Sequence, residues 1–385
     1  VILFIILVGI ETFYKQLPQL TLKRIEFKRQ MSVERVIAGE EAYLETIISN
    51  KKLIPLPWFK IHTTVPWQFA FKEAKTVQIR RDEACEHVVT SSLLFYEKLV
   101  RRDYFVALKR GYYKIDDFNF QSGDLFGWVD VEMNVHAPVH LFVHPVLKPL
   151  EKLIKSSRSL FGETSVRRWI VPDPLFTLGA RDYTSSDPFS AIDWKATARV
   201  NRLQVKQNDY TSDRTVQIFL DTQSHQIFWK HLRKEAVERG IEIAASVIHE
   251  GFNLKAPVGL IVNNLALDGG KIMTVLPGLS HGHRSVLMDT LAMSSAYCSE
   301  SMSNILRVKC RNLEQHTIIV LITACLTNDL LAQVNRLAKG GYHIKLVDLS
   351  LEPVVSGLHK GVEYYLPKEH IDQQITDIDE EAARA

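Results

Sequence analysis

The sequence has few of the residues and motifs that mark several common classes of protein. Four cysteines occur in 385 residues, without a Cys-x-x-Cys pair or a disulfide-framework spacing. We therefore expect buried free thiols and a reducing compartment. The chain contains no Gly-x-x-x-x-Gly-Lys loop and no Gly-x-Gly-x-x-Gly turn. Both absences argue against a directly bound nucleotide, and we expect no cofactor.

The sequence also has almost no excess of one charge sign over the other. Lys and Arg number 47 and Asp and Glu 44, which gives a formal net charge of +3. Basic and aromatic residues are not interleaved along any single element, so nothing in the sequence calls for a nucleic acid partner. A hydrophobic fraction of 46% and a charged fraction of 24% are typical of folded domains. The length is sufficient for two or three of them.

Long apolar runs are missing, apart from a short one at the start. Residues 1–10 are unbroken apolar sequence without an initiator Met, whereas a bilayer-spanning helix needs about 20 apolar residues. We interpret residues 1–14 as the C-terminal part of a transmembrane helix. The basic residues that follow predict that the remaining chain is cytoplasmic. A cleaved signal peptide is the alternative, but its basic residues would precede the apolar run.

The pattern changes along the chain from strands to alternating strands and helices. Residues 22–146 contain short alternating apolar segments separated by turn residues, which predict a β-sandwich. Residues 147–212 form a linker that includes the most distinctive segment. In residues 213–367 apolar runs alternate with helical patterns, which predicts a mainly parallel sheet covered on both faces. Residues 368–385 form a polar tail.

Three histidines recur every four residues, at His136, His140 and His144. On a helix this spacing would align three imidazoles for zinc. Pro138 and the alternation of residues 139–143 favour a strand instead, with His140 and His144 together on its solvent-facing side.

The distinctive segment covers residues 179–199 and reads Gly-Ala-Arg-Asp-Tyr-Thr-Ser-Ser-Asp-Pro-Phe-Ser-Ala-Ile-Asp-Trp-Lys-Ala-Thr-Ala-Arg. Asp187 followed by Pro188 predicts a helix start, because Asp accepts free N–H groups and Pro lacks one. A helix is expected over residues 188–199. In one interpretation it is a surface helix whose Asp193 pairs with an arginine; in the other it is a binding surface.

This segment, continued by Leu203-Gln-Val-Lys206, resembles the signature of the bacterial family called domain of unknown function 58. Ser186 and Ser190 replace a Gly and an Arg of the family pattern. The turns at residues 110–113 and 123–127 resemble turns of the family's β-domain. The resemblance implies a membrane-anchored protein with a von Willebrand factor A-like domain. Its implied partner is a MoxR-type AAA+ ATPase.

A von Willebrand factor A domain would place Asp-x-Ser-x-Ser after its first strand to bind Mg²⁺. This chain has Asp221-Thr222-Gln223-Ser224-His225. Gln223 offers an amide oxygen, but His225 offers nitrogen, and Mg²⁺ prefers oxygen ligands. Ala324 stands where a second carboxylate is expected. The position is therefore a degenerate metal site, and we expect Asp221 to cap the following turn; a metal-dependent binder is an alternative.

A second alternative is a serine hydrolase. Gly278-Leu-Ser-His-Gly282 matches the nucleophile elbow Gly-x-Ser-x-Gly. Ser280 would be the nucleophile, with the base and its orienting carboxylate drawn from His359, His370, Asp329 and Asp348. Pro277 lies between the strand and the motif, which places Ser280 in a loop rather than on a strained turn. Short motifs of this kind also arise by chance.

The predicted fold class is multi-domain: an N-terminal transmembrane segment, an immunoglobulin-like β-sandwich, and a von Willebrand factor A-like, Rossmann-like α/β domain. The predicted function is that of a non-enzymatic, membrane-anchored adaptor that binds a MoxR-type AAA+ ATPase and reaches the lipid bilayer through its N-terminal helix. Tryptophan and arginine dominate interaction hot spots. The expected interaction residues are Arg181, Tyr183, Asp187, Asp193, Trp194 and Arg199.

Overall fold

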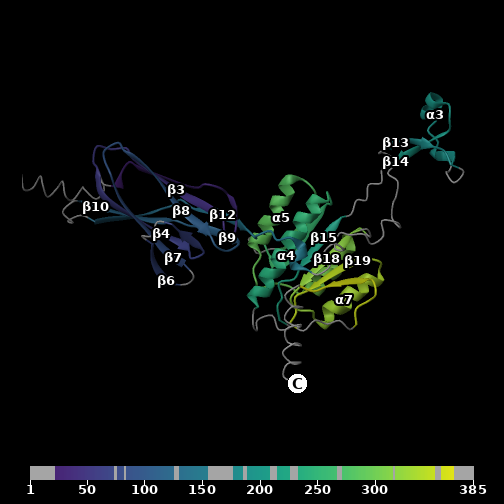
Figure 1. Ribbon diagram of the computed structural model, residues 1–385. Helices are drawn as coiled ribbons and strands as arrows, with labels where there is room; N and C mark the ends of the chain where they lie inside the picture. Colours follow the sequence, from purple (N-terminus) through teal and green to yellow (C-terminus); the bar gives the residue numbers. More distant parts are fainter. Residues whose placement is uncertain are drawn as a thin grey trace, which may run out of the picture. The chain divides into compact units, whose positions relative to one another are not determined.

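The computed structural model describes residues 22–72, 76–81, 84–124, 130–154, 177–184, 189–208, 215–225, 233–266, 271–314, 317–351 and 357–367. The chain divides into two compact units, each drawn from separate stretches of sequence (Figure 1). The first unit combines Val1–Leu147 with Asn264–Met273 and His281–Ser295. The second contains Lys148–Asn263, Thr274–Ser280 and Ala296–Ala385.

The first unit contains three antiparallel or mixed sheets. One sheet has the order β1-β3-β8-β5, formed by β1 (Ile25–Met31), β3 (Glu41–Asn50), β8 (Lys98–Ala107) and β5 (Phe69–Phe71). A second has the order β11-β10-β4-β7-β6, formed by β11 (Asp130–Val135), β10 (Phe118–Gly123), β4 (Leu56–Pro66), β7 (Ala84–Leu93) and β6 (Thr76–Arg81). The third joins β2 (Arg35–Ile37), β12 (Val139–His144) and β9 (Gly111–Ile115).

The first two sheets share a hydrophobic core, which makes this part of the chain a β-sandwich. Side chains alternate across each strand, so that Phe59 and Ile61 of β4 are buried while Lys60 between them is exposed. Phe59 and Phe120 stack with ring centroids 5.4 Å apart. From the opposite sheet, Ile48 is buried in the same cluster. Apolar burial between facing layers is what holds such sandwiches together.

Helix α5 (His281–Met293) packs against β12 and β9 of this unit. Asp289 on α5 accepts hydrogen bonds from Nη2 of Arg35 at 2.9 Å, and lies 2.8 Å from Nε2 of His144. Nη1 of Arg110 donates to the carbonyl oxygens of Leu291 and Ser294, both at 2.9 Å. These bonds give a side-chain donor to carbonyl groups at the end of the helix, where intrahelical donors run out.

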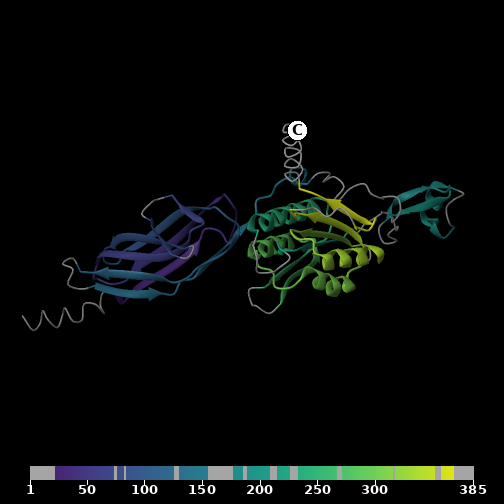
Figure 2. The same cartoon turned by 90° about the horizontal axis from the view of Figure 1, so that it is seen from below.

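The second unit contains a six-stranded sheet of order β17-β16-β15-β18-β19-β20 (Figure 2). The strands are β15 (Val216–Leu220), β16 (Val258–Leu265), β17 (Ile272–Gly278), β18 (Ile318–Thr323), β19 (His343–Asp348) and β20 (Val362–Tyr365). Neighbouring strands from β16 to β20 pair in parallel. Strand order reverses beside β15, so right-handed crossovers place α4 (Lys234–Asn253) and α7 (Asn328–Lys339) on opposite faces.

Smaller elements complete this unit. They are α2 (Leu150–Leu153), α6 (Met302–Lys309), the 3-10 turns η2 (Phe189–Ala191) and η3 (Cys310–Asn312), α3 (Trp194–Val200), and the two-stranded sheet of β13 (Thr177–Asp182) and β14 (Gln204–Asn208). The four cysteines are free; Cys85 and Cys310 are buried, and Cys298 and Cys325 are half-buried.

This architecture corrects the fold class expected from the sequence. The described chain is mostly β-sheet, and none of its helices is long and apolar enough to cross a membrane. Even α4, with 20 residues, is interrupted by charges such as Glu238 and Arg239. The expected transmembrane segment, residues 1–14, lies outside the described residues, and its ten-residue apolar run is about half of what a span requires.

Candidate functional site

The distinctive segment folds as a small unit of two strands and one helix. β13 and β14 pair antiparallel, with Arg181 opposite Val205. The chain between the strands forms η2 and α3, and Ile192 makes a β-bridge to Val205. Ile192 and Val205 are both buried, so they form the apolar contact beneath the helix. The nitrogen of Asp193 donates to the carbonyl oxygen of Gln204 at 2.8 Å and fixes the point where α3 begins.

Asp193 is the N-cap of α3. Its Oδ1 accepts hydrogen bonds from the backbone nitrogens of Lys195 at 3.0 Å and Ala196 at 3.1 Å. These bonds satisfy two of the four N–H groups that a helix start leaves unpaired. The helix therefore begins at Trp194, later than the start that Asp187 and Pro188 predict. Both of those residues lie outside the described residues.

The large apolar side chains of this unit are exposed. Trp194 is 66% exposed and Phe189 is 73% exposed, and Val200 is exposed at the other end of α3. The rings of Tyr183 and Phe189 lie with centroids 5.8 Å apart. Arg199 is an exposed cation on the same helix. We use the name Trp194 surface for the predicted interaction residues Arg181, Tyr183, Trp194 and Arg199 together with Phe189, all of which belong to this small unit.

The remaining predicted site residues of this segment have local roles. Arg181 is exposed, and its Nη1 donates to the carbonyl oxygen of Asp182 at 3.2 Å. Asp193, for which the sequence suggested an ion pair with Arg181 or Arg199, bonds to backbone nitrogens instead. A helix cap and an ion pair both suit an aspartate, and sequence spacing alone does not separate them.

A second polar cluster lies at the carboxyl ends of the central parallel strands. Asp221 directly follows β15 and is buried. Its Oδ1 accepts hydrogen bonds from Nδ2 of Asn263 at 2.7 Å and from the nitrogen of Gln223 at 3.0 Å. Its Oδ2 accepts one from Oγ1 of Thr323 at 2.9 Å. The carboxylate thus joins β15 to both neighbouring strands, at the point where an α/β sheet usually forms its crevice.

Burial controls the chemistry of this cluster. Desolvation raises the pKa of Asp221 to about 6, although its hydrogen bonds with Gln223, Thr323 and Asn263 act in the opposite direction. Burial, with the nearby Asp221 charge as a second cause, raises the pKa of Cys298 and of Cys325 to about 11. Both thiols therefore stay protonated near neutral pH and are poor nucleophiles.

At the degenerate metal site, the side chains of Asp221 and Gln223 are hydrogen-bonded to other protein groups. Oδ1 of Asp221 has two donors and Oδ2 has one. Nε2 of Gln223 donates to the carbonyl oxygen of His225 at 2.9 Å. Within the part of the chain that the structure describes, no group of three or more His, Cys, Asp or Glu side chains is placed to hold a metal ion.

Two of the residues proposed for a hydrolase, His359 and Asp348, are hydrogen-bonded to other groups. Ser280 lies between β17 and α5 and is exposed. Nδ1 of His359 accepts a hydrogen bond from the nitrogen of Gly361 at 3.1 Å, whereas a catalytic base would use that atom to donate to a carboxylate. Oδ2 of Asp348 accepts a bond from Tyr364 at 2.7 Å. His370 lies outside the described residues.

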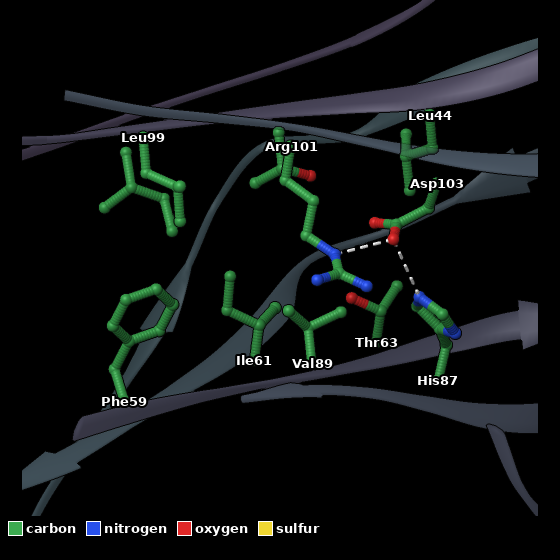
Figure 3. Close-up of a pocket in the computed structure, with 11 residues that line it drawn as sticks. Leu44, Phe59, Ile61, Thr63, His87, Val89, Leu99, Arg101 and Asp103 are labelled. Atoms are coloured by element: carbon green, nitrogen blue, oxygen red, sulfur yellow. Dashed lines mark hydrogen bonds and ion pairs between the residues drawn. The ribbon is translucent and has the colours of Figure 1, made fainter. Parts of the chain in front are cut away.

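A third polar cluster is enclosed in the β-sandwich. A cavity of about 10 Å³, room for about one water molecule, is lined by Thr46, Thr63, His87, Arg101 and Asp103 together with apolar side chains (Figure 3). Nε of Arg101 donates to Oδ1 of Asp103 at 2.7 Å, and His87 lies 3.6 Å from the same oxygen. Burial favours a raised pKa for Asp103, but His87 and Arg101 outweigh it and the pKa is lowered.

Comparison with known proteins concerns mainly the C-terminal part of the chain. Residues 179–350 match a family model described as "Protein of unknown function DUF58". The uncharacterized protein YeaD of Bacillus subtilis (strain 168) is 21% identical over 242 residues, which cover 62% of this chain and 56% of YeaD. The match thus spans little more than half of that relative's length. Both findings support the DUF58 family, whose function is unknown.

Two solved structures with β-rich domains each cover about a third of this chain. The CARDB domain of the PF1109 protein from Pyrococcus furiosus, solved with di-metal ions, is 18% identical and covers 33% of this chain and 98% of its own, with a TM-score of 0.21. The ASH/PapD-like domain of human CEP192 is 12% identical and covers 32% and 87%, with a TM-score of 0.22. Such low TM-scores carry no argument about this chain.

Sequence reasoning missed the partners of Asp221. Asn263 lies near the end of β16 and Thr323 is the last residue of β18. Asn263 is one of two adjacent asparagines in the otherwise apolar β16, and Thr323 is the one polar residue of β18; both lie close to the carboxyl end of their strand. This signal was present in the sequence, but which strands are neighbours had to be known before the residues could be grouped.

Proposed function

We propose that the protein is a non-enzymatic protein–protein interaction module whose partner binds the Trp194 surface. The observation that carries the proposal is the 66% exposure of Trp194. Tryptophan is a costly side chain to leave in water, and it is enriched together with arginine among residues that dominate binding energy. Arg181 and Arg199, both exposed, are the arginines of this surface.

The local fold supports a rigid presentation of these side chains. Asp193 caps α3, and Ile192 and Val205 are buried beneath it. A helix that is already fixed loses less conformational entropy on binding than a segment that must first fold. The Trp194 surface would therefore contribute its contact area at low entropic cost.

We further propose that the partner is a MoxR-type AAA+ ATPase and that the protein acts as its adaptor. The resemblance of residues 179–206 to the family signature supports this partner. The exposed basic residues of the Trp194 surface suit an acidic region on the ATPase, since complementary charges speed association.

Affinity capture tests the adaptor proposal. The full chain is used as bait in detergent-solubilised native membranes with ATP present, and captured proteins are identified by mass spectrometry. We expect an AAA+ ATPase with the wild type and a reduced amount with Trp194→Ala. Trp67→Ala is the matched control, because Trp67 is 39% exposed in the β-sandwich. Absence of any ATPase, or equal capture by both variants and the wild type, would contradict the proposal.

The non-enzymatic part of the proposal has a separate test. The purified chain is treated with a fluorophosphonate probe, which labels activated serines. We expect no labelling, because His359 and Asp348 are engaged by Gly361 and Tyr364. Labelling that disappears in Ser280→Ala would establish a serine hydrolase instead.

A further inference from the structure

Large apolar side chains are exposed together at one end of the β-sandwich. Leu94, Phe95 and Tyr96 lie in the turn between β7 and β8, and Leu53 lies in the turn between β3 and β4. Their exposed fractions range from 58% to 73%. We call these four residues the loop tip. Grouped exposed apolar side chains of this kind mark binding sites for proteins or membranes.

Hydrogen bonds hold the two turns side by side. Nδ2 of the buried Asn50 donates to the carbonyl oxygens of Ile54 at 2.9 Å and Leu94 at 2.8 Å. The nitrogen of Tyr96 donates to the carbonyl oxygen of Lys52 at 3.2 Å. Tyr96 has a φ of 53°, in the left-handed region that bulky residues rarely adopt. The turn is thus fixed in a conformation with an energetic cost, which is common at binding sites.

Exposed cations outnumber exposed carboxylates around the loop tip, with Lys23, Arg24, Lys51 and Lys98 against Glu26 and Glu97. The nitrogen of Lys51 donates to the carbonyl oxygen of Arg24 at 2.9 Å, which places the beginning of the described chain beside the turns. The two carboxylates of this end have partners within the protein. Glu26 pairs with Nζ of Lys51 at 2.5 Å, and Glu97 accepts a hydrogen bond from the nitrogen of Leu94 at 2.6 Å. The exposed cationic residues of this end are Lys23, Arg24, Lys51 and Lys98.

We propose that the loop tip binds an anionic lipid surface, with its four apolar side chains in the headgroup region and the surrounding cations on lipid phosphates. The ring of Tyr96 favours the membrane–water interface because its hydroxyl stays in the polar layer, and Phe95 supplies an apolar ring for insertion. Apolar insertion and electrostatic attraction are each weak alone, and membrane binding becomes stable when they act together. This proposal is independent of the Trp194 surface.

Phospholipid fits these observations better than a protein partner does. A lipid layer supplies hydrocarbon and phosphate groups side by side in a fluid plane. It can therefore accommodate apolar side chains and the cations around them at the same time, without a pocket of matched shape. Lysine stems also add apolar contact while their ammonium groups remain in the polar layer.

Vesicle flotation with the full chain tests the proposal. The vesicles consist of phosphatidylcholine alone or of an equimolar mixture with phosphatidylglycerol. We expect wild-type binding to the mixed vesicles, weaker binding to pure phosphatidylcholine, and a decrease with added salt. The double variant Phe95→Ser/Tyr96→Ser should lower the partition coefficient about tenfold or more. Lys23→Glu/Lys98→Glu should lower it about tenfold, and only on anionic vesicles.

Leu108→Ser is the matched control. Leu108 is 50% exposed and directly follows β8, whereas the loop tip precedes β8, so the two positions lie at opposite ends of one strand. We expect its partition coefficient to equal that of the wild type. Thermal unfolding by circular dichroism verifies that every variant is folded. The proposal is overturned if the wild type does not prefer anionic vesicles, or if folded tip variants bind as tightly as Leu108→Ser.

Discussion

Nδ2 of Asn263 donates a hydrogen bond to Oδ1 of Asp221 over 2.7 Å, and thereby ties β16 to the end of β15. Both residues are buried. The Oδ1 atom of Asn263 in turn accepts bonds from the nitrogen and the hydroxyl of Thr222, at 2.8 and 2.9 Å. The pair therefore makes a closed network at the centre of the sheet, where an unsatisfied polar group would be costly.

This network predicts a pH-dependent stability that Asp221→Asn removes. Burial raises the pKa of Asp221 to about 6 in the folded protein, above its ordinary value of 3.8. Its contribution to stability is thus fully present below about pH 4 and is lost as the pH rises through 6. The free energy of unfolding of the wild type relative to Asp221→Asn should fall by up to about 3 kcal/mol over this range. Urea unfolding at several pH values measures it.

Thr222→Val is the control for that experiment. It removes the hydroxyl bond to Asn263 without removing a titratable group. Its effect on the free energy of unfolding should be the same at every pH, about 1 kcal/mol. If the free energy of unfolding changes with pH in the same way in the wild type and in Asp221→Asn, the raised pKa of Asp221 is contradicted.

Asp103 should show the opposite pH dependence. Contact with His87 and the charge of Arg101 lower its pKa despite burial. Its contribution is present above the ordinary value of 3.8 and is lost as the pH falls through the lowered value. Asp103→Asn should therefore be less stable than the wild type at pH 7, with a difference that shrinks in acid. Chemical unfolding between neutral and acidic pH measures this, and a constant difference would refute it.

Truncation of Asp193 and of Trp194, the N-cap and the first residue of α3, should affect the stability of the protein differently. Asp193→Ala removes the N-cap bonds to Lys195 and Ala196, so it should lower stability by about 1 kcal/mol. Trp194→Ala removes an exposed side chain and should change stability by less than about 0.5 kcal/mol. Calorimetry of both variants provides the test. A large loss of stability in Trp194→Ala would show that its role is structural.

The attachment of α5 should depend on Arg110. Arg110→Met keeps much of the side-chain length but leaves the carbonyl oxygens of Leu291 and Ser294 without this donor. We expect a loss of about 1–3 kcal/mol and faster hydrogen exchange in the last turn of α5. Exchange measured by mass spectrometry should show no change in α7, which contacts β19 and β20. Uniform acceleration throughout the chain would contradict a local role.

Local patterns in the sequence predicted part of this structure. In β12 the buried residues Val139, Leu141 and Val143 alternate with less buried ones, as the sequence indicates. The expectation that His144 faces solvent is wrong, because its Nε2 lies 2.8 Å from Asp289. That contact joins residues 145 positions apart in sequence. The alternation of side chains along one strand cannot identify so distant a partner.

Other features depend on choices between chemically similar residues. Asp187 and Asp193 are both suitable caps, and the fold uses Asp193 because the bridge from Ile192 to Val205 fixes where the helix begins. Helix α6 was not predicted, since its eight residues are short for a periodic pattern. Grouping Asp221 with Thr323 required the strand order, which sequence periodicity does not determine.

The packing of α5 against β9 and β12 determines which fragments of the protein can be produced separately. A fragment that ends at Leu147 would contain strands β1 to β12 but not α5, which belongs to the same unit although it begins 134 positions further along. Arg35 and His144 would lose their shared carboxylate, Asp289. The fragment would expose a newly uncovered face and be prone to aggregate. A single cut in the chain therefore does not separate the two compact units.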